Sequence, residues 1–207
     1  MHWIEPCVKE NCPVVFSDFT DVIGYDDWQL RKIENFFDRG IINGYEDNTL
    51  RLNHSVTRAE FVAMLARKLG YEDLSVKALD FVDIPSGHWA NPVIAKLVSI
   101  GAINGVSETK FAPDEQITCE QAAKIIAVAY GWTKGVDIEK AGGYPRAYYQ
   151  MADFKGILDD VKAGQSEPIN RMDLIEMLYS ATEHFDAESF LKFAYRDHET
   201  RSNWYWQ

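Results

Sequence analysis

An internal repeat with a period of 61 residues constrains the fold of this chain more than any other feature of its sequence. Shifting the sequence by this period brings residues of the same type together. The matched pairs are Trp28 with Trp89, Ile33 with Ile94, Gly40 with Gly101, Ile42-Asn43-Gly44 with Ile103-Asn104-Gly105, Thr57 with Thr118, Ala66 with Ala127 and Gly70 with Gly131. So many matches of Trp, Gly and Asn in one register indicate two copies of one unit.

Each copy predicts two helices separated by a turn-rich loop. In the first copy, Trp28, Ile33 and Phe36 form an apolar face with helical spacing, and this face stops at Gly40. After the loop, a second helix is expected to begin behind Thr57 and to end before a glycine that can take the left-handed C-cap conformation. The second copy repeats the same pattern up to Gly131.

A third, degenerate copy follows with a shorter loop. Residues 147–154 match the first helix and residues 171–179 match the second. One helix pair cannot bury both of its faces, so three pairs should share a core. The expected fold is therefore all-α, with three helix-loop-helix repeats packed as a pseudo-threefold bundle. The predicted segments are an N-terminal extension (1–15), repeat 1 (16–75), repeat 2 (76–135), the degenerate repeat 3 (136–183), and a C-terminal helix and tail (184–207).

The start of each second helix carries a capping pattern. Thr57 at the N-cap with Glu60 three residues later is typical of a capping box, in which each side chain binds a backbone N–H of the other residue. Thr118 and Gln121 can form the same pair, and Asn170 with Asp173 approximates it in the third copy. We interpret all of these residues as structural.

Arg58, the first residue after this N-cap, calls for another explanation. A cation in the first helical turn faces the positive end of the helix dipole, so stability alone favours an acidic residue there. We interpret Arg58 as an anion-binding residue beside free backbone N–H groups, and its guanidinium suits a carboxylate. Arg171 recurs at the matching place, which strengthens this reading against a solvated surface arginine. On this view Arg58→Ala should cost little stability.

These motifs carry a resemblance to a known family. They are Phe19-Thr20-Asp21-Val22, Trp28, Gly40-Ile41-Ile42-Asn43-Gly44-Tyr45 and Thr57-Arg58-Ala59-Glu60. Together they resemble the surface-layer homology (SLH) repeat of bacterial cell-surface proteins, over residues 16–183. The resemblance implies grooves between the repeats that bind pyruvylated secondary cell-wall polysaccharide without a covalent bond. It also implies that Arg58 contacts the acidic sugar, and that Gly44, Trp28 and Asp21 support this contact.

The three copies depart from the motif to different degrees. The second copy has Cys119 in place of the arginine, whereas the third copy keeps Arg171 in a poorer context. We expect a good groove at Arg58, a weaker one at Arg171 and a lost one at Cys119. The leading hypothesis is a cell-wall anchor at the bacterial surface. The alternative is an SLH-like scaffold that no longer binds sugar and contacts other surface proteins. We expect Trp28 and Trp89 to pack rather than to stack on sugars.

Composition argues against other classes of function. The net charge of −11 disfavours nucleic acid, which needs a basic surface, and anionic membranes. No apolar run is long enough to cross a membrane. The histidines and cysteines lack the spacing of metal ligands, and the acidic loop at residues 46–48 lacks that of an EF-hand. No catalytic constellation stands out among the 32 acidic residues, so we expect neither enzyme activity nor a cofactor.

The N-terminus and the cysteines leave alternatives open. Residues 1–6 have neither the basic start nor the apolar stretch of a signal peptide. The chain could be cytosolic, could have lost a signal, or could be part of a longer secreted protein, and the resemblance favours the last two. Cys7 and Cys12 lie close enough in sequence to pair, which would leave Cys119 as a free thiol, or all three thiols could be free.

Overall fold

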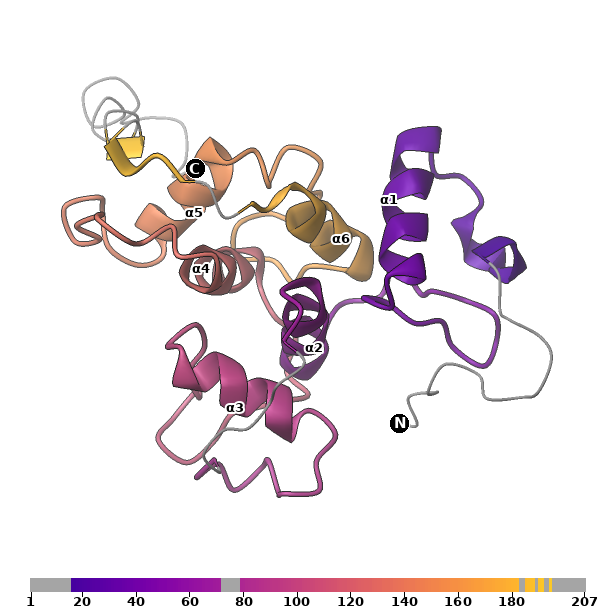
Figure 1. The fold of residues 1–207 in the computed structure, drawn as a ribbon, viewed down its shortest axis with the longest axis horizontal. Coiled ribbons are helices and arrows are strands. Elements are labelled where there is room, and N and C mark those ends of the chain that lie inside the picture. Colours follow the sequence, from indigo (N-terminus) through magenta and orange to yellow (C-terminus); the bar gives the residue numbers. More distant parts are fainter. Residues whose placement is uncertain (1–15, 72–78, 183–184, 189, 192–193, 195–207) are drawn as a thin grey trace.

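The computed structural model describes residues 16–71, 79–182, 185–188, 190–191 and 194. Within these ranges the chain forms two short 3-10 helices, six α-helices and no β-strand, so the predicted all-α class is confirmed (Figure 1). The 3-10 helices are η1 (Phe16–Asp18) and η2 (Thr20–Val22). The α-helices are α1 (Asp27–Asp38), α2 (Arg58–Lys68), α3 (Asn91–Ser99), α4 (Cys119–Ala129), α5 (Arg146–Phe154) and α6 (Arg171–Ser180).

The six helices pair between repeats. Helix α3 packs on α2, α5 packs on α4, and α1 packs on α6, while α2 also contacts α6 (Figure 1). The first helix of each repeat therefore lies against the second helix of the repeat before it in a cyclic order. The α1–α6 pair closes this order by joining repeat 1 to repeat 3. The buried apolar side chains of all three repeats form one continuous core.

Three segments meet at the centre of this arrangement, each directly before the second helix of a repeat. The N–H of Val56 donates to the carbonyl of Ile169 (2.9 Å), the N–H of Ile169 to Ile117 (3.1 Å), and the N–H of Ile117 to Val56 (3.0 Å). All three side chains are fully buried. This closed ring of backbone hydrogen bonds joins each repeat to the other two and forms the centre of the pseudo-threefold bundle.

The first backbone N–H groups of the second helices also bind neighbouring repeats. In α2 the N–H of Arg58 donates to Glu115 (2.8 Å) and that of Ala59 to Pro113 (3.0 Å), both carbonyls of repeat 2. The same pattern joins Cys119 and Glu120 to Glu167 and Gln165, and Arg171 and Met172 to His54 and Leu52. These donors would otherwise lack partners at a helix start. The expectation of free N–H groups beside Arg58 is therefore wrong, because packing between repeats occupies them.

The ends of the chain are described only in part. In the C-terminal segment the N–H of Phe190 donates to the carbonyl of Asp186 (3.0 Å), and the Phe190 ring is buried against Phe154 and Phe185. The extension at 1–15 and the tail at 195–207 lie outside the described residues, and so do Cys7 and Cys12, whose pairing stays open. The predicted domain boundaries stay predictions.

Candidate functional site

Capping boxes set the first residue of α2, α4 and α6. The hydroxyl of Thr57 accepts from the N–H of Glu60 (3.2 Å), and the Glu60 carboxylate accepts from the N–H of Thr57 (2.9 Å). The pairs Thr118–Gln121 and Asn170–Asp173 have the same geometry. Arg58, Cys119 and Arg171 therefore occupy equivalent helix starts.

A loop follows the first helix of each repeat. We call these loops turn 1 (41–48), turn 2 (102–109) and turn 3 (157–162).

The Arg58 side chain reaches from repeat 1 to turn 2 and to Phe111 just after it. Its Nε donates to the carbonyl of Phe111 (3.1 Å) and its Nη2 to that of Asn104 (2.9 Å), while the guanidinium carbon lies 4.8 Å from the Phe111 ring centre. Only 6% of Arg58 is exposed, and this burial lowers its pKa. Arg58 is therefore a buried cation that holds two repeats together, and the alternative of a solvated surface arginine is excluded.

Arg171 makes the equivalent contacts with turn 1 and with Leu50 just after it. Its Nε donates to the carbonyl of Leu50 (2.8 Å) and its Nη2 to that of Asn43 (3.1 Å). These two residues match Phe111 and Asn104 in the repeat alignment. The side chain is 1% exposed, and its remaining Nη1 is buried without a hydrogen-bond partner. Repeats 3 and 1 are therefore joined in the same way as repeats 1 and 2.

Cys119 cannot make such contacts with turn 3. Its thiol is free and fully buried, and burial, aided by the charges of Asp173 and Glu120, raises its pKa to about 12. The thiol is therefore protonated near neutral pH and carries no charge that could attract a carboxylate.

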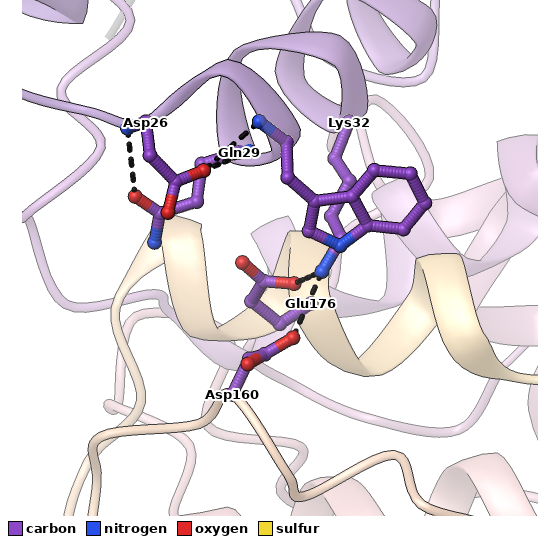
Figure 2. Close-up of polar contacts among 6 residues, drawn as sticks. Asp26, Gln29, Lys32, Asp160 and Glu176 are labelled. Atoms are coloured by element: carbon purple, nitrogen blue, oxygen red, sulfur yellow. Dashed lines mark hydrogen bonds and ion pairs between the residues drawn. The ribbon is translucent and has the colours of Figure 1, made fainter.

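Turn 3 instead carries a cluster of ion pairs that the sequence did not predict (Figure 2). The ammonium of Lys32, from α1, contacts Asp160 (3.0 Å) in turn 3 and Glu176 in α6. Burial opposes the charge on Lys32, but its bonds to the two carboxylates outweigh this effect and raise the pKa of the ammonium. Lys32 also lies 5.2 Å from the ring centre of Trp28. At turn 3 the positive charge is thus neutralised within the protein.

Asp21 and Gly44, two further predicted site residues, hold the backbone of repeat 1. The Asp21 carboxylate accepts from the N–H groups of Leu50 (2.8 Å) and Arg51 (2.7 Å), where Arg51 has a φ of 50°. A Cβ on Gly44 would lie 2.1 Å from the ring of Phe19, so only glycine allows this close approach. Asp83 and Gly105 have the matching roles in repeat 2.

The aromatic residues at or just before the start of the first helices are partly exposed. Trp28 is 54% exposed and Trp89 is 43% exposed, so the protein covers about half of each, and the expectation that they pack rather than stack on sugars stays a prediction. Trp28 does contact Tyr179, with ring centres 5.9 Å apart. When Gly156 is aligned with Gly101, Tyr144 falls at the third equivalent position, and it is 56% exposed.

Two more cations approach the turns from the second helices. Lys124 in α4 donates to the carbonyl of Ala102 in turn 2 (3.0 Å), and Arg67 in α2 donates to that of Ile41 in turn 1 (3.4 Å). The repeat alignment gave no signal for either residue, because Lys124 aligns with an alanine and Arg67 with a valine.

Two other kinds of site, for a metal ion and for a membrane-spanning helix, find no support in the described parts of the chain. In these parts, no group of three or more His, Cys, Asp or Glu side chains could hold a metal ion. Each helix there is too short or too polar to cross a lipid bilayer.

Comparison with known proteins matches two segments of this sequence to one family. The model of the S-layer homology domain matches residues 18–62 and 80–123. A cell surface protein of Thermoanaerobacter kivui is 30% identical over 172 residues, which is 81% of this chain and 21% of that protein. The surface-layer 125 kDa protein of Lysinibacillus sphaericus is 25% identical over 183 residues, 83% of this chain and 15% of that protein.

A cellulosome-anchoring protein of Acetivibrio thermocellus (strain ATCC 27405 / DSM 1237 / JCM 9322 / NBRC 103400 / NCIMB 10682 / NRRL B-4536 / VPI 7372) is 37% identical over 82 residues, 40% of this chain and 18% of that protein. The chain thus spans at most about a fifth of these relatives. The matched domains and the surface relatives place it at the bacterial cell surface. Repeats 1 and 2 are therefore S-layer homology domains, over residues 18–62 and 80–123.

Proposed function

We propose that this chain is a non-enzymatic module that anchors a surface protein by binding an anionic, pyruvylated secondary cell-wall polysaccharide at turns 1 and 2. The observation that carries the proposal concerns the charges of Arg58 and Arg171, the two arginines at the starts of the second helices. Among the residues that the structure describes, Arg58 and Arg171 form no ion pair, although both are buried. The carboxylates of Glu115 and Asp83 act on Arg58, and those of Glu60 and Asp21 on Arg171, only from beyond ion-pair distance. A buried charge without a contacting counter-ion is costly, and a carboxylate ligand would supply that contact.

Turn 3 has the opposite arrangement. The buried cation there, Lys32, already contacts two carboxylates of the protein itself. The position of the motif arginine is occupied by Cys119, whose neutral thiol has no charge to offer. An anionic ligand would gain little at turn 3 and would be repelled by Asp160. We therefore place ligand binding at turns 1 and 2.

Retention on purified cell walls stripped of protein tests this proposal. The variant Arg58→Lys combined with Arg171→Lys keeps both charges but loses the planar fork that binds a carboxylate through two hydrogen bonds. We expect it to lose most of the retention, and we expect chemical removal of pyruvate from the wall to have the same effect on the native chain. Arg31→Lys, on the exposed face of α1, is the matched control.

Circular dichroism should verify that each variant is folded before its retention is compared. Equal retention of the native chain and the double variant on intact walls would reject the polysaccharide anchor. That result would favour the alternative of an SLH-like scaffold that contacts other surface proteins.

A further inference from the structure

Two cations of different repeats converge on turn 2. Arg58 donates to the carbonyl of Asn104 at 2.9 Å, and Lys124 donates to the carbonyl of Ala102 at 3.0 Å. Since these carbonyls are two residues apart, the guanidinium and the ammonium lie on the same short stretch of backbone. Burial lowers the pKa of Lys124, and the positive charge of Arg58 lowers it further.

Turn 1 shows the same arrangement, built from a different position. Arg171 donates to the carbonyl of Asn43 at 3.1 Å and Arg67 to that of Ile41 at 3.4 Å, and these carbonyls match the two in turn 2. The pKa of Arg67 is lowered by burial and then by the charge of Arg171. Arg67 lies one helical turn beyond Ala63, the residue that aligns with Lys124. A second cation therefore lies at both turns, although it comes from a different position of the repeat in each case.

Carboxylates act on these cations only from beyond ion-pair distance: Glu115 and Asp83 raise the pKa of Arg58, and Glu60 and Asp21 raise that of Arg171, each by less than burial lowers it. In the described part of the chain, none of the four side chains forms an ion pair, and Nη1 of Arg171 is buried without a partner. Two like charges at one turn repel each other, so each pair costs stability unless an anion lies between them. Turn 3 lacks this feature, because Glu176 occupies the position that matches Lys124 in the helix.

We propose that Lys124 and Arg67 are the second anion-binding residues of turns 2 and 1. This inference rests on the proposed function and extends it. Each turn holds one carboxylate-bearing sugar residue between two cations, of which the motif arginine is only one. The chain therefore binds two such sugars, one at turn 1 and one at turn 2, and none at turn 3.

The test is an NMR titration of the folded chain with a methyl hexopyranoside that carries a pyruvate ketal. The backbone amides of Gly105 and Gly44 report separately on turns 2 and 1. We expect Lys124→Met to weaken binding at Gly105 by about tenfold to a hundredfold, the range for a lost charge-assisted hydrogen bond, and to leave binding at Gly44 unchanged. Arg67→Met should have the reverse effect, and Lys124→Arg should retain most of the affinity.

Two controls separate the failure of this inference from failure of the proposed function. Lys140→Met removes a lysine whose charge is already paired with Asp137 at 3.4 Å, and it should change neither titration. If Lys124→Met and Arg67→Met both bind as tightly as the native chain while Arg58→Lys binds more weakly, the inference is overturned and the proposed function stands. If the native chain does not distinguish the ketal from the same glycoside without it, both are overturned.

Discussion

The backbone N–H of Val56 donates to the carbonyl of Ile169 at 2.9 Å, and this bond joins repeat 1 directly to repeat 3. With the two equivalent bonds through Ile117, it closes a ring at the centre of the molecule. The helix starts at Arg58, Cys119 and Arg171 follow two residues after the members of this ring. The ring therefore positions the backbone of Arg58, Cys119 and Arg171. The packing of the neighbouring repeats then determines which groups their side chains contact.

Arg58→Ala should destabilise the chain by about 1–3 kcal/mol, because it removes two hydrogen bonds from a buried cation to carbonyls of repeat 2. This reverses the expectation from the helix dipole alone, since the side chain turns out to be buried rather than solvated. Thr57→Ala should cost about 1 kcal/mol through loss of the N-cap bond. Urea denaturation measures the loss of stability in each variant. An Arg58→Ala variant as stable as the native chain would contradict the prediction.

Lys32→Met should cost about 3–5 kcal/mol, because it leaves the buried carboxylate of Glu176 without its partner. Combining it with Glu176→Leu should recover much of this loss, since both charges are then gone. A double-mutant cycle in urea measures the coupling between the two residues. Additive losses in the double variant would show that the two charges do not stabilise each other.

Asp83→Asn should reduce the loss of stability in acid. Burial opposes the charge on Asp83, but hydrogen bonds from the N–H groups of Phe111 and Ala112 outweigh it and lower the pKa of this carboxyl. A folded-state pKa below the unfolded value contributes stability that is present above the unfolded pKa and is lost as pH falls through the folded pKa. Denaturation between pH 7 and pH 2 should show a smaller loss for Asp83→Asn than for the exposed control Asp114→Asn. Parallel curves for the two variants would exclude this role for Asp83.

Gly44→Ala should destabilise the chain by about 1–3 kcal/mol, because the added methyl group would overlap the buried ring of Phe19. Gly87→Ala is the matched control, since a Cβ there would meet no atom within 4 Å. Thermal melting of the two variants compares them directly. A Gly44→Ala variant that melts with the control would mean that the ring of Phe19 can move away at little cost.

Local sequence patterns were enough to predict the features that depend on near neighbours. The repeat, the helix starts at Arg58 and Arg171 and the left-handed glycine that ends α2 could all be predicted, because capping boxes and C-caps involve residues within a few positions of each other. The degenerate third helix pair was also recognisable, since its N-cap pattern survives in Asn170 and Asp173.

The contacts of the charged side chains, in contrast, depend on how the repeats pack in three dimensions. Lys32 contacts residues 128 and 144 positions away, and no local pattern connects them. Arg58 was expected beside free N–H groups, but the next repeat occupies those donors and also accepts from its guanidinium. The repeat pattern did not reveal Lys124 and Arg67, because each lies at a position where the copies carry different residues. These contacts arise between repeats, so they depend on how three units pack together and not on the sequence of any one of them.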